Sequence, residues 1–222
     1  MTRPRGDSAL PAGDAEDLRP GAVASTAMTA PDDFESTRRR LSPQQAETVA
    51  RLTDAALAVL QQVGYAKLTV RRVAAEADVA PATAYTYFSS KNHLIAEVFW
   101  RRLAAMPEDA DTGGTPVERV SAVLRTVALL VSDEPELAGA VTAALLGDDP
   151  EVQHLRVRIG LTVRRRLVRA LTAEDPDAEV DPDVLEALEV IWTGGLVRAG
   201  MGHQTYTEIA DRLATFARLI LE

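Results

Sequence analysis

The chain has no cysteine and only three histidines among its 222 residues. Without cysteine it can form neither a disulfide, nor a cysteine-ligated zinc cluster, nor a catalytic thiol. No run approaches the roughly 18 apolar residues that span a bilayer, and the first residues lack the apolar centre of a secretory signal. These absences argue against an enzyme and predict a soluble, cytoplasmic protein with no cofactor, no metal and no membrane partner.

Charge is present in quantity but is distributed unevenly. The formal net charge is −9, yet residues 36–102 contain ten Lys/Arg and only five Asp/Glu. A positive segment inside an acidic chain indicates a local binding site for a polyanion such as nucleic acid. Residues 1–35 are rich in Pro, Gly, Ala and Asp without apolar periodicity, which predicts a disordered N-terminal tail.

Helix starts are marked by proline that follows a capping residue. Ser42-Pro43 and Thr115-Pro116 each place Pro at the first helical position of a capping box. Behind each start, apolar residues recur at intervals of three and four, and no segment forms a convincing strand. The sequence predicts an all-α fold of about nine helices, near 43–63, 70–77, 81–88, 92–106, 116–132, 135–146, 150–173, 182–200 and 207–221. The division among the first four follows the family resemblance described below.

Residues 64–91 have the pattern of a helix-turn-helix. Gly64 can end the first helix with a positive φ, and Thr69 can cap the next helix through its hydroxyl. A tight turn at 78–80 then precedes Pro81, which starts a second short helix. Two short helices joined by a tight turn, with hydroxyls and aromatic rings on the second, are typical of a helix-turn-helix.

The candidate DNA-binding residues come from this segment. The second short helix is narrow enough for the major groove, where its hydroxyls can reach base edges or phosphates. The capped end of the first can bind a phosphate, assisted by the helix dipole. The arginines at 38–40 are a candidate arm on the DNA, with solvated charge as the alternative. The predicted DNA-binding set is Thr69, Arg71, Arg72, Thr83, Tyr85, Thr86, Tyr87 and Lys91.

The two tyrosines of this set have a competing interpretation as core residues. Because Tyr85 and Tyr87 are two positions apart, they cannot share one face of a helix. At least one should therefore be exposed, whereas Phe88 is expected in the core.

The same residues resemble the DNA-binding domain of the tetracycline-repressor (TetR) family. The resemblance covers about residues 45–96 and rests above all on the run from Thr83 to Lys91, TAYTYFSSK. It implies an all-helical homodimer with a DNA-binding domain at 36–92 and a ligand-binding and dimerisation domain at 93–222. The helices near 182–200 and 207–221 would form the dimer interface. The resemblance also implies that Thr69, Thr83, Tyr85, Tyr87 and Lys91 occupy positions that commonly contact operator DNA.

Three positions depart from the family pattern. Asp78 stands where relatives usually have Gly, but Asp tolerates a left-handed conformation better than most residues. Ala80 replaces a frequent Ser or Thr and so removes a cap that is worth about 1 kcal/mol. Ala84 replaces a common Leu and makes the core-facing side of the second helix less bulky.

Candidate effector-binding residues lie on helices that would border a cavity in the second domain. Aromatic and Met side chains favour apolar ligands, and ordinary packing, or a structural role for the histidine, is the alternative for each residue. The candidates are Trp100, Met106, His154 and Trp192.

Two further clusters have simpler interpretations. The arginines of 164–169 lie in the acidic half of the chain, which favours surface ion pairs. Gly194, Gly195 and Gly200 each weaken their helix by roughly 1 kcal/mol, and a dimer partner is the leading candidate for the neighbour that approaches them.

The leading hypothesis is a ligand-responsive repressor that binds a palindromic operator as a homodimer. The recognition helices of the two subunits would lie about 34 Å apart, one turn of DNA, and an unknown small-molecule effector, apolar in character, would release the DNA. Two alternatives stay open: an activator or effector-independent DNA-binding protein, and a helical enzyme whose first helices are only structural.

Overall fold

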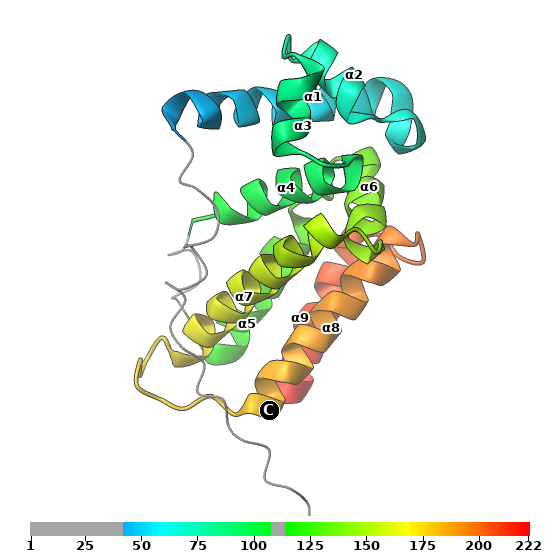
Figure 1. Cartoon of the computed structure of the whole chain (residues 1–222). Helices are drawn as coiled ribbons and strands as arrows, with labels where there is room; N and C mark the ends of the chain where they lie inside the picture. The colour runs from blue at the N-terminus through cyan, green and yellow to red at the C-terminus, as the bar shows by residue number, and fades with distance from the viewer. Residues whose placement is uncertain (1–41, 108–113) are drawn as a thin grey trace, which may run out of the picture. The chain divides into compact units, whose positions relative to one another are not determined.

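The computed structural model describes residues 42–107 and 114–222, and every regular element in these ranges is an α-helix (Figure 1). The all-α prediction is confirmed, whereas the predicted tail at 1–35 and the candidate arm at 38–40 lie outside the described residues. The helices are α1 (Pro43–Lys67), α2 (Val70–Glu76), α3 (Pro81–Tyr87), α4 (Lys91–Ala104), α5 (Pro116–Leu129), α6 (Pro135–Leu146), α7 (Pro150–Thr172), α8 (Pro182–Gly200) and α9 (Tyr206–Leu221).

Capping residues decide where several helices begin. Ser42, Thr115 and Thr205 each accept a hydrogen bond from a backbone N–H three residues on, and the side chain at that third position binds back to the cap. These three capping boxes satisfy N–H groups that would otherwise lack a partner. Gly64 adopts φ +71° and kinks α1 before its last turn, because glycine takes up a positive φ without a Cβ clash.

Two of the capping boxes give stability a predictable pH dependence. The pKa values of Glu118 and Glu208 lie below the ordinary 4.5 because the backbone N–H groups of Thr115 and Thr205 donate to their carboxylates. A lowered pKa in the folded state adds stability above the unfolded pKa, and this stability is lost as the pH falls through the folded value. We expect Glu208→Gln to reduce the fall in the urea midpoint between about pH 5 and pH 3.

The matched control is Glu136→Gln, which alters an exposed glutamate in the first turn of α6 that belongs to no capping box. It should leave the pH dependence of the midpoint unchanged. Identical pH profiles for Glu208→Gln and the wild type would contradict the assignment of this stability to the capping box.

Helix α4 lies between the first three helices and the remainder of the fold (Figure 1). It packs against α1 on one side and against α6 and α7 on the other. Leu94, Ile95 and Ala96 are consecutive and fully buried, and a helix that is buried nearly all round must have neighbours on every side. Any change in the packing of α6 or α7 therefore acts on α4 directly.

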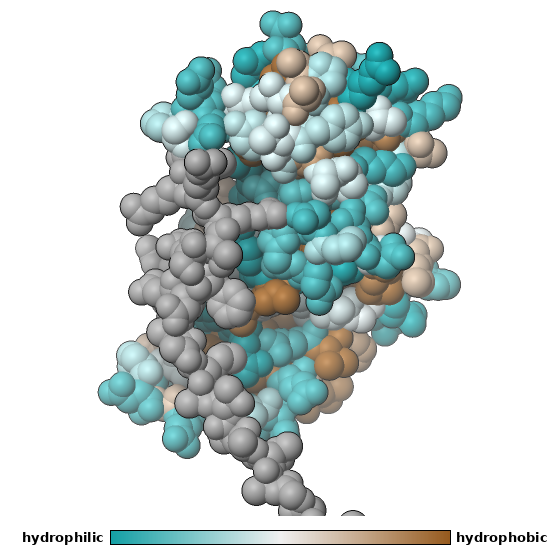
Figure 2. Space-filling view, viewed as in Figure 1, coloured by the Kyte–Doolittle hydropathy of each residue, from teal (hydrophilic) through white to brown (hydrophobic). Residues whose placement is uncertain are grey.

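The remaining helices form the body of the protein. Helix α5 packs against α7 and α9, and α8 packs against α9. Apolar residues reach the surface of this body over α8 (Figure 2), where Val190 is 62% exposed. No helix in the described ranges is long and apolar enough to cross a membrane.

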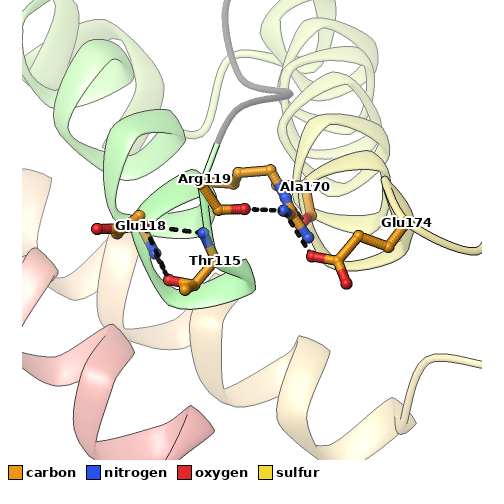
Figure 3. Close-up of polar contacts among 6 residues, drawn as sticks. Thr115, Glu118, Arg119, Ala170 and Glu174 are labelled. Carbon is orange, nitrogen blue, oxygen red and sulfur yellow. Dashed lines mark hydrogen bonds and ion pairs between the residues drawn. The ribbon is translucent and has the colours of Figure 1, made fainter.

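Four helices end at carbonyl groups that are bound by an arginine from another helix. A guanidinium group at a helix C-terminus satisfies free carbonyls and interacts favourably with the helix dipole. The four contacts are Arg51 of α1 to Ala77 and Asp78 after α2, Arg166 of α7 to Met106 and Pro107 after α4, Arg156 of α7 to Leu145 in the last turn of α6 and to Gly147 after it, and Arg119 of α5 to Ala170 at the end of α7 (Figure 3). These arginines tie the ends of helices to neighbouring helices.

These contacts correct the ion-pair interpretation of the arginines at 164–169. Arg164 does pair with Glu189 of α8, at 3.0 Å from nitrogen to oxygen. Arg166, in contrast, is buried and donates to the carbonyls of Met106 and Pro107 at 2.8 and 2.9 Å. The prediction was wrong for Arg166 because the tertiary fold places its guanidinium group against carbonyls that are 59 and 60 positions away in sequence.

The glycines of α8 also require a correction. A Cβ at Gly195 would lie 3.0 Å from Ile209 of α9, and a Cβ at Gly200 would collide with Thr142 of α6. The close neighbours of these two glycines therefore belong to the same chain and not to a dimer partner. A Cβ at Gly194 would meet no atom within 4 Å, so this glycine faces open space.

Candidate nucleic-acid interface

The turn between α2 and α3 depends on the backbone conformation of one of its own residues and on hydrogen bonds from a side chain of α1. Asp78 has φ +51° and is the only non-glycine residue with a positive φ in the described ranges. The guanidinium group of Arg51 donates to the carbonyls of Ala77 and Asp78. Ala80 provides no side-chain cap for α3, as predicted. Arg51 of α1 therefore compensates in part for a turn that lacks both the usual glycine and the usual cap.

Helix α3 has one buried face and one exposed face. Ala84 is fully buried and Phe88, which follows the helix, is 2% exposed. Thr83 and Thr86 are exposed, and Tyr85 keeps 51% of its surface exposed. Tyr87 is half-buried and packs against the core. The predictions for Phe88 and for the separation of the two tyrosines are confirmed, and the exposed face presents hydroxyls, methyl groups and one aromatic ring.

The candidate interface also includes the start of α2. Thr69 caps this helix, because its Oγ1 accepts a hydrogen bond from the backbone N–H of Arg72 at 3.2 Å. Thr69, Arg71 and Arg72 are all exposed. The two guanidinium groups and the capped helix start can interact with phosphates of a nucleic-acid backbone.

Lys91 is held in place by the end of α1. Its Nζ donates to the carbonyl of Tyr65 at 2.9 Å and lies 4.3 Å from the centroid of the Tyr65 ring. An ammonium group has three donors, so the hydrogen bond to Tyr65 leaves donors for a further acceptor. Sequence reasoning selected Lys91 but missed Tyr65 and Arg51, whose partners lie more than 25 residues away.

The four candidate effector-binding residues make different contacts. The guanidinium group of Arg158 lies 4.4 Å from the centroid of the Trp100 ring, and His154 packs edge-on against His93. Trp192 is buried, and its indole N–H has no hydrogen-bond partner among the described residues. The carbonyl of Met106 receives the hydrogen bond from Arg166 already described.

Two surface grooves lie away from the four candidate effector-binding residues. One lies between α5 and α9, and the other, of about 390 Å³, lies between α8 and α9. None of the four candidate effector-binding residues lines either groove. Their role in effector binding stays a prediction.

The turn, the exposed face of α3 and the positive start of α2 together define a helix-turn-helix DNA-binding protein. The models for "Bacterial regulatory proteins, tetR family" and for the "Tetracyclin repressor-like, C-terminal domain" match residues 52–98 and 113–220. The chain belongs to the TetR family of bacterial transcriptional regulators, and it is a DNA-binding regulator of transcription.

Individual relatives support this assignment. An HTH-type transcriptional regulator of Mycobacterium tuberculosis is 50% identical over 180 residues, which cover 80% of this chain and 82% of the relative. The HTH-type transcriptional repressor KstR of Rhodococcus jostii is 30% identical over 182 residues, covering 81% of this chain and 85% of the repressor. The fold is also similar to that of Thermus thermophilus FadR, a TetR-family repressor solved in complex with lauroyl-CoA, with a TM-score of 0.62, 17% identity and coverage of 78% and 95% of the two chains.

Proposed function

We propose that this regulator is a ligand-responsive repressor that binds a palindromic operator as a homodimer. The exposed face of α3 carries this proposal, because its hydroxyls, its methyl groups and the Tyr85 ring suit the edges of bases in the major groove. Thr83, Tyr85 and Thr86 contact bases, whereas Tyr87 and Lys91 bind the DNA backbone beside them. Thr69, Arg71 and Arg72 bind a neighbouring phosphate. The similarity to the repressor KstR favours repression over activation.

In this proposal the chain divides into a DNA-binding domain at 36–92 and a ligand-binding and dimerisation domain at 93–222. The second domain pairs through α8 and α9. Phe216 and Leu219 of α9 are 40% and 73% exposed, and Val190 of α8 is exposed as well. Large apolar side chains gathered on neighbouring helices are typical of a protein–protein interface. Gly194, which faces open space and lines the same α8–α9 groove as Phe216, lets a helix of the partner approach closely.

The effector in this proposal is an amphipathic acyl compound. The similar fold of Thermus thermophilus FadR was solved with lauroyl-CoA, and the scarcity of aromatic residues, at 5%, suits an aliphatic ligand better than a flat aromatic one. The indole N–H of Trp192, buried and without an acceptor in the described ranges, can donate to a polar group of the ligand such as a carbonyl oxygen. Trp100, Met106 and His154 line the same ligand site in this proposal.

Substitutions on α3 and α2 test the proposal. We expect Thr83→Ala and Tyr85→Ala to weaken binding to the operator by roughly 10- to 100-fold while binding to unrelated DNA stays constant, because base contacts carry the specificity. Arg71→Ala should instead weaken both and lower the slope of log affinity against log salt by about 1. Fluorescence anisotropy with labelled duplexes from the region upstream of the gene measures both quantities.

The matched control for Arg71 is Lys67→Ala, which removes an exposed cation at the end of α1, outside the proposed interface. It should change specific and unrelated binding by less than Arg71→Ala does. An intact dimer that binds palindromes and unrelated duplexes with equal affinity would contradict the proposed function. Transcript levels in a deletion strain distinguish the two modes of regulation, because target transcripts rise if the protein represses and fall if it activates.

A further inference from the structure

One carboxylate connects the starts of two helices that are far apart in sequence. Asp149 caps α7, because its Oδ1 accepts a hydrogen bond from the backbone N–H of Glu151 at 2.9 Å. Its Oδ2 accepts a hydrogen bond from the hydroxyl of Ser90. Ser90 in turn caps α4, since its Oγ accepts from the backbone N–H of His93 at 3.0 Å. The first turn of α4 is therefore fixed to the first turn of α7.

The same turn of α4 is also bound by α1. The hydroxyl of Tyr65 donates to Oδ1 of Asn92. Burial, together with the negative charge of Asp149, raises the pKa of the Tyr65 hydroxyl, which keeps this donor protonated. The four residues Tyr65, Ser90, Asn92 and Asp149, called the α4 joint below, thus form a polar connection from α1 across α4 to α7.

Rings pack beside the α4 joint and continue the connection to α3. Phe88 packs edge-on against His93, with ring centroids 5.5 Å apart, and His93 packs edge-on against His154 of α7 at 5.9 Å. These ring contacts add packing between α3, α4 and α7. Hydrogen bonds are strongly directional, so the α4 joint further restricts the angle between α4 and its neighbours.

We propose that the α4 joint sets the separation between the two DNA half-sites that the dimer accepts. The inference rests on the proposed function, in which α8 and α9 pair two bodies and each body carries α1–α3 at its other end. A small rotation of α1–α3 about the start of α4 moves α3 along the DNA and changes the distance between the two recognition helices. The joint residues contact no DNA in this proposal; they are positioning residues that act through α3.

Two substitutions each remove one hydrogen bond of the α4 joint while preserving the local helix structure. Asp149→Ser keeps a good capping residue for α7 but removes the second oxygen that holds Ser90. Tyr65→Phe removes only the hydroxyl that binds Asn92. Ser90→Thr keeps both the cap and the hydroxyl donor and serves as the conservative variant. The matched control is Asp181→Ser, because Asp181 caps α8 through the backbone N–H of Asp183 and also precedes a proline.

The test measures the affinity of each full-length variant for a series of operators whose half-site spacing is changed by one or two base pairs in either direction. We expect the wild type, Ser90→Thr and Asp181→Ser to prefer one spacing sharply. In Asp149→Ser and Tyr65→Phe, the ratio of affinities between the best spacing and a spacing two base pairs away should fall by about fivefold, the effect of one lost hydrogen bond. Penalties for base changes within a half-site should stay as in the wild type.

Three outcomes would overturn the inference. Folded Asp149→Ser and Tyr65→Phe variants with the wild-type spacing profile would show that the joint does not position α3. An equal loss of affinity at every spacing would assign these residues a purely structural role. A wild-type dimer without preference for any palindrome would overturn the proposed function and this inference with it, and this result is distinguishable because it appears before any substitution is made.

Discussion

Replacing both Phe216 and Leu219 with glutamate is expected to separate the proposed dimer into monomers and to weaken operator binding by about 100-fold or more. Both side chains are exposed on α9, and the proposed dimer buries them against the partner. Carboxylates at these positions would have to lose their hydration without gaining a partner, which is strongly unfavourable. A monomer binds each half-site separately. It lacks the high effective concentration that a dimer gives its second DNA-binding domain once the first is bound.

Light scattering coupled to size-exclusion chromatography measures the mass, and fluorescence anisotropy measures the affinity for the operator. The matched control is Leu146→Glu, since Leu146 is also an exposed leucine, at 54%, but lies on α6. This variant should stay dimeric and keep its affinity. A double glutamate variant that remains a dimer would show that the chain pairs through a different surface.

The second large effect concerns folding stability. We expect Arg119→Met to lower the free energy of unfolding by about 3 kcal/mol, because hydrogen bonds of a charged group at a buried site are lost and each buried carbonyl left without a donor is costly. The side chain of Arg119 is 1% exposed, and its Nε donates to the carbonyl of Ala170 at 2.7 Å (Figure 3). Nη1 also donates to the carbonyl of Gly114 and to Oε1 of Glu174.

The loss of stability in Arg119→Met should be smaller than the summed contributions of these hydrogen bonds. Nη2 of Arg119 is buried without a partner in the described part of the chain, so replacing the guanidinium also removes the cost of dehydrating this nitrogen. In a protein of this size, about 3 kcal/mol corresponds to a decrease of roughly 6–12 °C in the midpoint of thermal unfolding.

Arg125→Met is the matched control for Arg119→Met. Arg125 lies on the same helix and pairs with Asp211, but both side chains are largely exposed, at 45% and 63%. Exposed ion pairs contribute about 0–1 kcal/mol, so this substitution should change the urea midpoint only slightly. If both variants lost the same amount of stability, the carbonyl contacts of Arg119 would contribute nothing beyond a surface charge.

The sequence by itself determined the helices and the faces of α3. Capping boxes and N-terminal prolines act over three or four residues, so the starts of α1, α5 and α9 could be located from local patterns alone. Tyr85 and Tyr87 could be assigned to different faces because residues two positions apart cannot share one face of a helix, and the structure leaves Tyr85 exposed and packs Tyr87 against the core. The candidate DNA-binding set lies on one contiguous segment, which is why a family resemblance could identify it.

Only the tertiary structure decided which helix ends meet. Asp149 reaches Ser90 across 59 positions of sequence, and Arg166 reaches Met106 across 60. Nothing in the local pattern around Arg166 distinguished a buried capping group from a surface charge, and nothing around Gly200 indicated that Thr142 fills the space beside it. Local patterns record short-range geometry, whereas contacts between helices depend on how the whole set of apolar faces packs together. The α4 joint is for this reason visible only once α1, α4 and α7 have been brought to the same place.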